Sequence, residues 1–257
     1  MKKNKNSNKE KRVRVLTEND NFYTVETYKS IRTNVMFSLP MSDGGKVIPI
    51  TSSIPDEGKT TTSINLAIVF AQTGERVLLI DCDLRKSRVH RYLGLDRKNG
   101  LSNVICGYLG LDDAIKKNVR PNLDCITAGE IPPNPAELLD SDEFAKIINE
   151  LKKRYDYIFI DTPPVVVVTD AAIILRQADG VIVVSKENYV TYDALDVTMD
   201  TIKRTGVKIL GVVVTGCDEK RAHYNYYGGR KRGYGNYKYK YNYNYHYGDD
   251  NVKENGK

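Results

Sequence analysis

Short apolar runs and amphipathic segments alternate along the middle of this chain. Runs of Val, Ile and Leu predict strands at residues 47–52, 76–81, 123–127, 157–161, 180–185 and 208–215. Apolar positions at helical spacing predict helices at 25–39, 59–72, near Val89, and at 141–154, 170–177 and 191–205. Because the strands are apolar throughout, helices should cover both faces of the sheet. The pattern predicts an α/β fold with a doubly wound, mostly parallel sheet, although Pro49 cannot donate a hydrogen bond within the first strand.

The two ends of the chain depart from this pattern. Residues 1–20 are polar and rich in lysine and arginine, and residues 218–257 are dominated by Tyr, Asn, Gly, Lys and Arg. We therefore expect one domain at 21–217, between a disordered basic arm and a disordered tail. The formal net charge of +6 is concentrated at these ends, and for the arm both a solvated segment and a contact with an anionic membrane surface fit the charge.

Cysteine and histidine positions give no sign of a metal centre. Cys82, Cys106, Cys125 and Cys217 lack metal-type pairing and compact disulfide spacing, which favours a reducing cytoplasm. Cys82 is expected to pack in the core, and His90, His223 and His246 are expected at the surface. The longest apolar runs, such as 165–168, are far shorter than a bilayer span. We expect a soluble protein that reaches the membrane through a partner.

A phosphate-binding loop lies between the first strand and the helix at 59–72. The segment 53–60 reads Ser-Ile-Pro-Asp-Glu-Gly-Lys-Thr, with Ser53 where the general Walker A motif has its first glycine. Backbone N–H groups at the start of the helix would hold phosphates, Lys59 would reach the β- and γ-phosphates, and the Thr60 hydroxyl would ligate Mg²⁺. The candidate nucleotide-binding residues are Ser53, Asp56, Glu57, Gly58, Lys59, Thr60 and Thr61.

Carboxylates end two of the predicted strands. Asp81 and Asp83 follow the strand at 76–81, and Asp161 ends the strand at 157–161. A single aspartate at a strand end is more often a turn or helix cap, but two such strands beside a phosphate-binding loop favour a site at the carboxyl edge of the sheet. Thr60, Asp161 and Asp83 are the candidate Mg²⁺ residues.

These features together resemble the bacterial tyrosine kinases of capsule and exopolysaccharide assembly, in the separate cytoplasmic form of Gram-positive organisms. The resemblance covers roughly residues 25–247. It rests on the phosphate-binding loop, the Asp-Cys-Asp-Leu-Arg segment at 81–85, the strand ending at Asp161, and Pro-Pro-Asn-Pro-Ala-Glu-Leu-Leu at 132–139. It implies a P-loop NTPase fold, ATP and Mg²⁺ as cofactors, and protein-tyrosine phosphorylation.

The resemblance also implies partners. A ring of identical subunits would be joined through Glu26, Lys29 and Arg32, where Lys29 stands in place of the family's arginine and loses its bidentate fork. A membrane adaptor of the polysaccharide co-polymerase type and a cognate tyrosine phosphatase are expected, with the kinase at the inner face of the membrane. Ser87 replaces the family's usual proline. Thr215 stands where the family commonly has an asparagine that contacts the adenine. The resemblance therefore does not imply that base contact for this chain.

The tail supplies the expected phosphate acceptors, which are tyrosines at close spacing: Tyr224, Tyr226, Tyr227, Tyr234, Tyr237, Tyr239, Tyr241, Tyr243, Tyr245 and Tyr247. A phenol needs a carboxylate to orient it or take its proton, and Asp81 is the first candidate and Asp83 the second, with Lys59 stabilising the phosphates. Asp170 would either line the acceptor site or cap the next helix, and the cap is favoured.

Two other classes of function fit parts of the sequence. A partitioning-type P-loop ATPase would share the nucleotide site but would not need the tyrosine cluster. Nucleic-acid binding through the tail would use its aromatic rings for stacking and residues such as Arg230, Lys231 and Arg232 for phosphates. Because the tyrosine kinase accounts for the loop, the carboxylates and the tail together, we expect no nucleic-acid partner.

Overall fold

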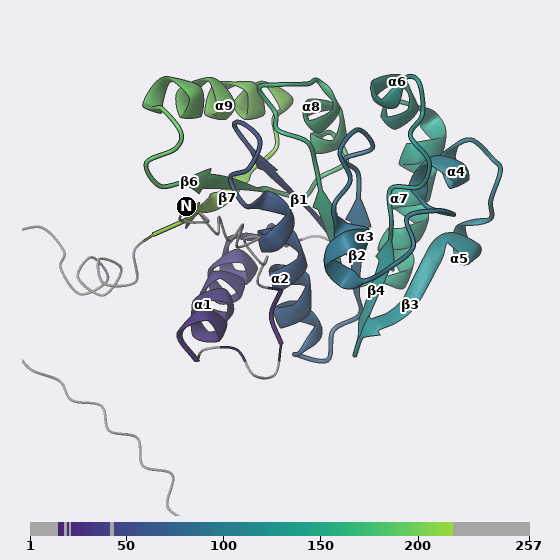
Figure 1. The fold of residues 1–257 in the computed structure, drawn as a ribbon, viewed down its shortest axis with the longest axis horizontal. Coiled ribbons are helices and arrows are strands. Elements are labelled where there is room, and N and C mark those ends of the chain that lie inside the picture. The colour runs from purple at the N-terminus through teal and green to yellow at the C-terminus, as the bar shows by residue number, and fades with distance from the viewer. Residues whose placement is uncertain (1–14, 18–19, 21, 42–43, 218–257) are drawn as a thin grey trace, which may run out of the picture. The chain divides into compact units, whose positions relative to one another are not determined.

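A seven-stranded sheet forms the centre of the fold (Figure 1). The computed structural model describes residues 15–17, 20, 22–41 and 44–217. The strands are β1 (Lys46–Ser52), β2 (Val77–Asp81), β3 (Ile115–Arg120), β4 (Leu123–Ile126), β5 (Tyr157–Asp161), β6 (Val181–Lys186) and β7 (Ile209–Thr215). Their order is β3-β4-β2-β5-β1-β6-β7, and β3 alone runs antiparallel to its neighbour. The expected doubly wound, mostly parallel sheet is confirmed.

Helices lie on both faces of this sheet. They are α1 (Phe22–Ser38), α2 (Lys59–Ala71), α3 (Val89–Leu93), α4 (Leu101–Ile105), α5 (Leu111–Ala114), α6 (Pro135–Leu139), α7 (Asp142–Arg154), α8 (Asp170–Leu175) and α9 (Tyr192–Thr205). Figure 1 shows α1 and α2 on one side of the sheet and α7, α8 and α9 on the other. Within the described ranges, no helix has both the length and the apolar character that a membrane span requires.

Successive side chains of the central strands pack into two separate hydrophobic cores, one on each face of the sheet. On β2, Leu78 and Ile80 pack with α7, whereas Leu79 packs with α2. On β5, Ile160 joins the first core and Phe159 the second. This alternation is the reason that the strands read as continuous apolar runs, because each face of the sheet is covered by helices.

Helix α2 is buried almost all round. Of its thirteen residues only Lys59 and Thr61 are partly exposed, because the sheet covers one side and α1 packs over another. Arg32 on α1 donates a hydrogen bond from Nη1 to the carbonyl oxygen of Val69 on α2 at 2.6 Å. The helix that begins at the phosphate-binding loop is thus held rigidly against the centre of the sheet.

Pro49 is accommodated because of the way β1 pairs. β1 pairs with β5 from Lys46 to Ile50, whereas its register with β6 begins only at Ile50. The missing N–H of Pro49 therefore lies before the ladder with β6, and the strand is regular despite the proline. Cys82 is buried in the core, as expected.

The edge strand β3 and the short helices α4 and α5 were not expected from the sequence. β3 reads Ile-Lys-Lys-Asn-Val-Arg, with Lys117 and Asn118 exposed, and it carries no apolar run. A polar network joins it to the neighbouring strand: Asp124 on β4 accepts hydrogen bonds from Tyr155 Oη at 2.6 Å, Lys117 Nζ at 2.9 Å and Asn118 N at 2.8 Å. Burial acts to raise the pKa of Asp124, but these three donors outweigh it and the pKa lies below its ordinary value. Burial and Asp124 raise the pKa of Tyr155 to about 12.

Candidate functional site

The loop between β1 and α2 has the backbone shape of a phosphate-binding loop. Gly58 precedes the first residue of α2 with φ 95°, and Asp56 also has a positive φ of 64°. Among the described residues, no side chain caps the N-terminus of α2. Backbone N–H groups at such a helix start are available to an anion, and the helix dipole favours negative charge there.

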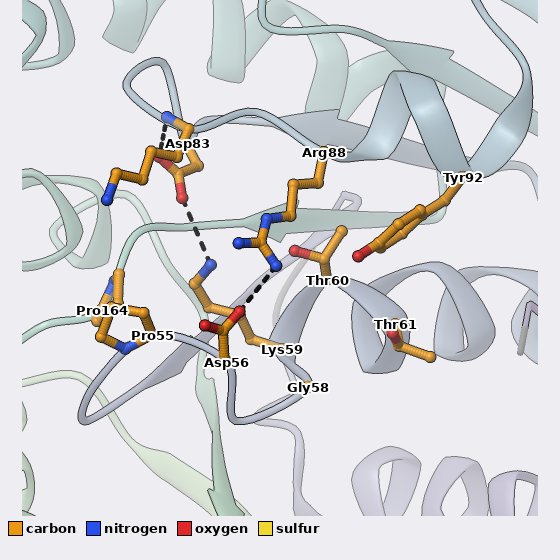
Figure 2. A pocket seen from close by; sticks show the side chains of 11 residues that line it. Pro55, Asp56, Gly58, Lys59, Thr60, Thr61, Asp83, Arg88, Tyr92 and Pro164 are labelled. Atoms are coloured by element: carbon orange, nitrogen blue, oxygen red, sulfur yellow. Dashed lines mark hydrogen bonds and ion pairs between the residues drawn. The ribbon is translucent and has the colours of Figure 1, made fainter. Parts of the chain in front are cut away.

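A pocket opens in front of this loop (Figure 2). One wall is the loop and the start of α2, with Pro55, Asp56, Gly58, Lys59, Thr60 and Thr61. The facing wall comes from the segment after β2, with Asp83, Lys86, Arg88 and Tyr92, and Pro164 follows β5. Three parallel strands therefore deliver the lining residues from their carboxyl ends, where ligands of open α/β sheets bind.

Lys59 and the strand-end carboxylates form one charged cluster. Lys59 Nζ lies 3.4 Å from Asp83 Oδ2, and both side chains are largely buried. The Thr60 hydroxyl donates to Asp161 Oδ2 at 2.7 Å, and Ser63 Oγ lies 3.2 Å from Asp161 Oδ1. Burial acts to lower the pKa of Lys59, but the charges of Asp161 and Asp83 outweigh it and the pKa is raised. The ammonium group stays charged in this pocket.

Asp81 lies behind the pocket wall. Its carboxylate is fully buried and accepts the backbone N–H groups of Asp83 and Val89, each at 3.2 Å. Burial, followed by the charges of Asp161 and Asp83, raises the pKa of Asp81 well above its ordinary value. Burial also raises the pKa of Asp161, although Lys59 and the Thr60 hydroxyl oppose the shift. Asp83 faces the pocket, whereas Asp81 is fully buried and does not line it.

Lys86, Arg88 and Tyr92 line the pocket but were not predicted from the sequence. Arg88 Nη1 pairs with Asp56 Oδ1 at 2.9 Å, joining the segment after β2 to the phosphate-binding loop, as Figure 2 shows. The backbone N–H of Lys86 donates to Asp83 Oδ1 at 2.9 Å. Both basic residues closely follow the 81–85 segment, so their proximity to Asp83 was a usable signal. Tyr92, on α3, had no such signal.

The expectation that Asp170 caps a helix was wrong. Thr169 is the N-cap of α8, and Asp170 is the first helical residue. Its carboxylate is fully buried and forms a bidentate pair with Arg85, with Nε–Oδ2 at 2.8 Å and Nη2–Oδ1 at 3.0 Å. Both carboxylate oxygens of Asp170 thus bond to the Arg85 guanidinium instead of capping the helix. The ion pair joins the segments that follow β2 and β5.

Two of the expected nucleotide-binding side chains turn away from the pocket. Ser53 is buried, and its Oγ accepts a hydrogen bond from Thr198 on α9 at 2.7 Å. Glu57 is buried as well, and its Oε1 accepts the backbone N–H of Ile54 at 2.7 Å. Asp56, Gly58, Lys59, Thr60 and Thr61 line the pocket. Ser53 and Glu57 therefore shape the loop from behind.

Glu26, Lys29 and Arg32 lie on α1. Lys29 Nζ pairs with Glu26 at 2.8 Å, and both side chains are more than 40% exposed. Arg32 makes the contact with Val69 described above. The tail tyrosines, His223 and His246 lie outside the described residues.

The oxygen atoms near Thr60 fit a magnesium ion that takes part of its ligands from a nucleotide. Among the described residues, no three His, Cys, Asp or Glu side chains are placed to hold a metal ion together. Thr60 and Asp161 nevertheless present a hydroxyl and a carboxylate 2.7 Å apart beside Lys59. Mg²⁺ prefers such oxygen ligands and commonly keeps waters and substrate phosphates in its shell.

Comparisons with known proteins decide the family. The family described as AAA domain matches residues 45–209. The tyrosine-protein kinase YwqD of Bacillus subtilis is 37% identical over 229 residues, which are 89% of this chain and 96% of that kinase. This chain belongs to the bacterial tyrosine kinases. The tyrosine-protein kinase wzc of Salmonella typhimurium is 36% identical over 79% of this kinase, which spans only 28% of wzc.

Solved structures agree with this assignment. The chimerical protein CapA2B2 superposes with a TM-score of 0.70 and 38% identity, covering 74% of this kinase and 83% of that chain. The septum site-determining protein MinD of Pyrococcus horikoshii, complexed with Mg-ADP, gives a TM-score of 0.58 and 27% identity over 70% of this kinase and 76% of that chain. The P-loop NTPase fold is thereby confirmed, and so is the resemblance to tyrosine kinases.

Proposed function

We propose that this kinase transfers the γ-phosphoryl group of Mg-ATP to the tail tyrosines of a neighbouring copy, and that this reaction regulates the synthesis and export of capsular polysaccharide or exopolysaccharide. The observation that carries the proposal is the pocket in which Lys59 pairs with Asp83, while Thr60, also in its lining, bonds to the buried Asp161. The tail, at residues 218–257, supplies a dense cluster of tyrosines in the same chain.

Lys59 and the loop would hold the phosphates. In phosphoryl transfer the bond from phosphorus to the β-γ bridging oxygen breaks as the phenol oxygen bonds to phosphorus, and positioning and charge neutralisation supply most of the catalysis. With a nucleotide bound, the Lys59 ammonium would exchange its pairing with Asp83 for the β- and γ-phosphates. Thr60, Asp161 and Asp83 are the residues that would hold Mg²⁺, which when bound offsets the negative charge on the phosphates.

The pair Asp81 and Asp83 would handle the phenol proton. Asp83 lines the pocket, so its carboxylate can reach an incoming hydroxyl. Burial raises the pKa of Asp81 well above its ordinary value, but its oxygens are engaged by backbone N–H groups. An efficient base combines reach with a suitable pKa, so single Asp-to-Asn variants at both positions distinguish the two roles.

Assembly and location follow the family expectation. Glu26, Lys29 and Arg32 would join subunits in a ring so that one copy's tail enters another copy's pocket. A membrane adaptor would bring the kinase to the inner face of the membrane, and a tyrosine phosphatase would reset it. Each phosphate adds a charge of about −1.5 to −2, so a multiply phosphorylated tail would be repelled from the carboxylate-lined site and the ring would dissociate.

The transfer between subunits can be tested by mixing two variants. One carries Lys59→Met and an intact tail, and the other is active but has all tail tyrosines replaced by phenylalanine. With Mg-ATP, mass spectrometry should find phosphate on the Lys59→Met tail. An unlabelled tail, under conditions in which wild type labels itself, would mean that transfer stays within one chain. The same measurement on a Lys59→Met protein alone is the control and should show no label.

A further inference from the structure

The phosphate-binding loop is fastened from behind by the ends of β6 and β7. Thr215, the last residue of β7, donates a hydrogen bond from Oγ1 to the carbonyl oxygen of Glu57 at 2.6 Å. The Glu57 carboxylate in turn accepts from the backbone N–H of Lys186, the last residue of β6, at 3.2 Å. Lys186 and Thr215 are partners in the β6–β7 ladder. The last residues of β6 and β7 therefore both bond to Glu57 of the loop.

The Glu57 side chain also braces the loop internally. Its second oxygen, Oε1, accepts the N–H of Ile54 at 2.7 Å, and the residue has no exposed surface. Burial raises the pKa of Glu57, while the N–H groups of Ile54 and Lys186 favour its charged form. A buried carboxylate that accepts two backbone N–H groups fixes the positions of both donors, because losing either bond leaves a buried polar group unpaired.

Thr215 also fills the space beside Gly58 that a side chain there would need. A Cβ placed on Gly58 would lie 3.4 Å from both Oγ1 and Cγ2 of Thr215. Gly58 is the residue that turns the chain into α2 with a positive φ. The threonine thus bonds to the carbonyl group of Glu57 and occupies the space next to the following residue, Gly58.

We propose that Thr215 and Glu57 are positioning residues that hold the phosphate-binding loop in its binding shape, and that Thr215 is not a contact to the nucleotide base. The proposal rests on the nucleotide site proposed above. A threonine hydroxyl has one proton to donate, and here the Glu57 carbonyl accepts it, so the hydroxyl cannot also donate to a base. Removing the hydroxyl should loosen the backbone N–H groups that meet the phosphates, so it weakens every ligand with a phosphate chain, whatever its base.

The experiment measures dissociation constants by calorimetry for ATP, GTP and inorganic tripolyphosphate, each with excess Mg²⁺. For Thr215→Val, which keeps the shape and removes the hydroxyl, all three constants should rise by about three- to tenfold, with the ATP-to-GTP ratio unchanged. Thr215→Ser should restore binding. Glu57→Gln should also raise all three constants, because the amide group offers a donor where one backbone N–H needs an acceptor.

Controls separate the loop from general stability. Thr201→Val removes a hydroxyl that bonds to Val197 within α9 and does not line the pocket, so it should leave all three constants at the wild-type value. Thermal unfolding of each variant checks that it is folded. A changed ATP-to-GTP ratio with unchanged tripolyphosphate binding would make Thr215 a base contact and overturn the proposal, as would unchanged constants in Thr215→Val. Wild type that binds none of the three ligands would instead overturn the nucleotide site itself.

Discussion

The ion pair between Arg85 and Asp170 makes a quantitative prediction about stability. Asp170 is fully buried, whereas the Arg85 side chain is 41% exposed. Removing one partner of a fully buried pair costs about 3 to 5 kcal/mol, and exposed pairs contribute about 0.2 to 1 kcal/mol. Because one partner here is partly in water, we expect Arg85→Ala to lower the free energy of unfolding by about 2 kcal/mol, between those limits.

A double-mutant cycle with Asp170→Asn isolates the pair. Asp170→Asn should cost less than Arg85→Ala, because the exposed guanidinium can be solvated whereas the buried carboxylate cannot. The double variant should be more stable than the sum of the two losses predicts, with a coupling energy of about 1 to 2 kcal/mol. Urea unfolding followed by circular dichroism measures these values. In thermal unfolding, a loss of 2 kcal/mol corresponds to about 4 to 8 °C for a domain of this size.

The control is an ion pair in which both side chains are exposed. Lys203 and Asp200 pair along α9 with both side chains more than 60% exposed. Lys203→Ala should change the free energy of unfolding by no more than about 0.5 kcal/mol. If Arg85→Ala is equally mild, or if the losses of Arg85→Ala and Asp170→Asn simply add, the pair does not hold the two pocket segments together and the reasoning fails.

Three further predictions concern the charged groups. Lys59→Met should abolish tyrosine phosphorylation while the protein still folds, because no backbone hydrogen bond depends on the ammonium group; kinase activity at the wild-type level would remove the loop from the mechanism. Asp81→Asn and Asp83→Asn should each lower the rate of phosphoryl transfer more than the affinity for nucleotide. Asp161→Asn should instead raise the Mg²⁺ concentration needed for half-maximal activity. If Asp81→Asn and Asp83→Asn lose ATP binding in proportion to activity, the two aspartates are metal ligands. Asp124 has a lowered pKa in the folded protein, so its stabilisation is complete above its ordinary pKa of 3.8 and is lost as the pH falls through the lowered value. Asp124→Asn should be less stable than wild type at pH 7, and the two proteins should converge below pH 4; a constant difference across that range would rule out the carboxylate as the cause.

The sequence predicted the sheet well because its strands are buried on both faces. Each expected strand lies within two residues of its observed bounds, and even Pro49 fits because of the late start of the β6 ladder. β3 was missed for the opposite reason. It is an edge strand with Lys117 and Asn118 exposed, and Asp124 on the neighbouring strand bonds to both of them, so no apolar pattern marks it in the sequence.

The sequence predicted which residues form the candidate site, but not the directions in which their side chains point. Motif spacing identified Lys59, Thr60 and the strand-end aspartates. It could not show that Glu57 points towards the strand ends while Asp56 faces the pocket, because that depends on the positive φ angles of Asp56 and Gly58. The partner of Asp170 was equally hidden, since Arg85 is 85 residues away along the chain.

The packing of α1 on α2 limits how subunit assembly can be studied. The helix that carries Glu26, Lys29 and Arg32 also covers the apolar surface of α2, with Val35 buried between them. Deleting α1 to obtain a monomer would expose that surface, so a truncated protein would aggregate or lose α2 whether or not a ring exists. Point substitution at the exposed Glu26 and Lys29 leaves the covering surface in place, whereas Arg32 also bonds to Val69 and mixes the two effects. Substitutions at the exposed Glu26 and Lys29 can therefore test subunit assembly without disturbing the packing of α1 on α2.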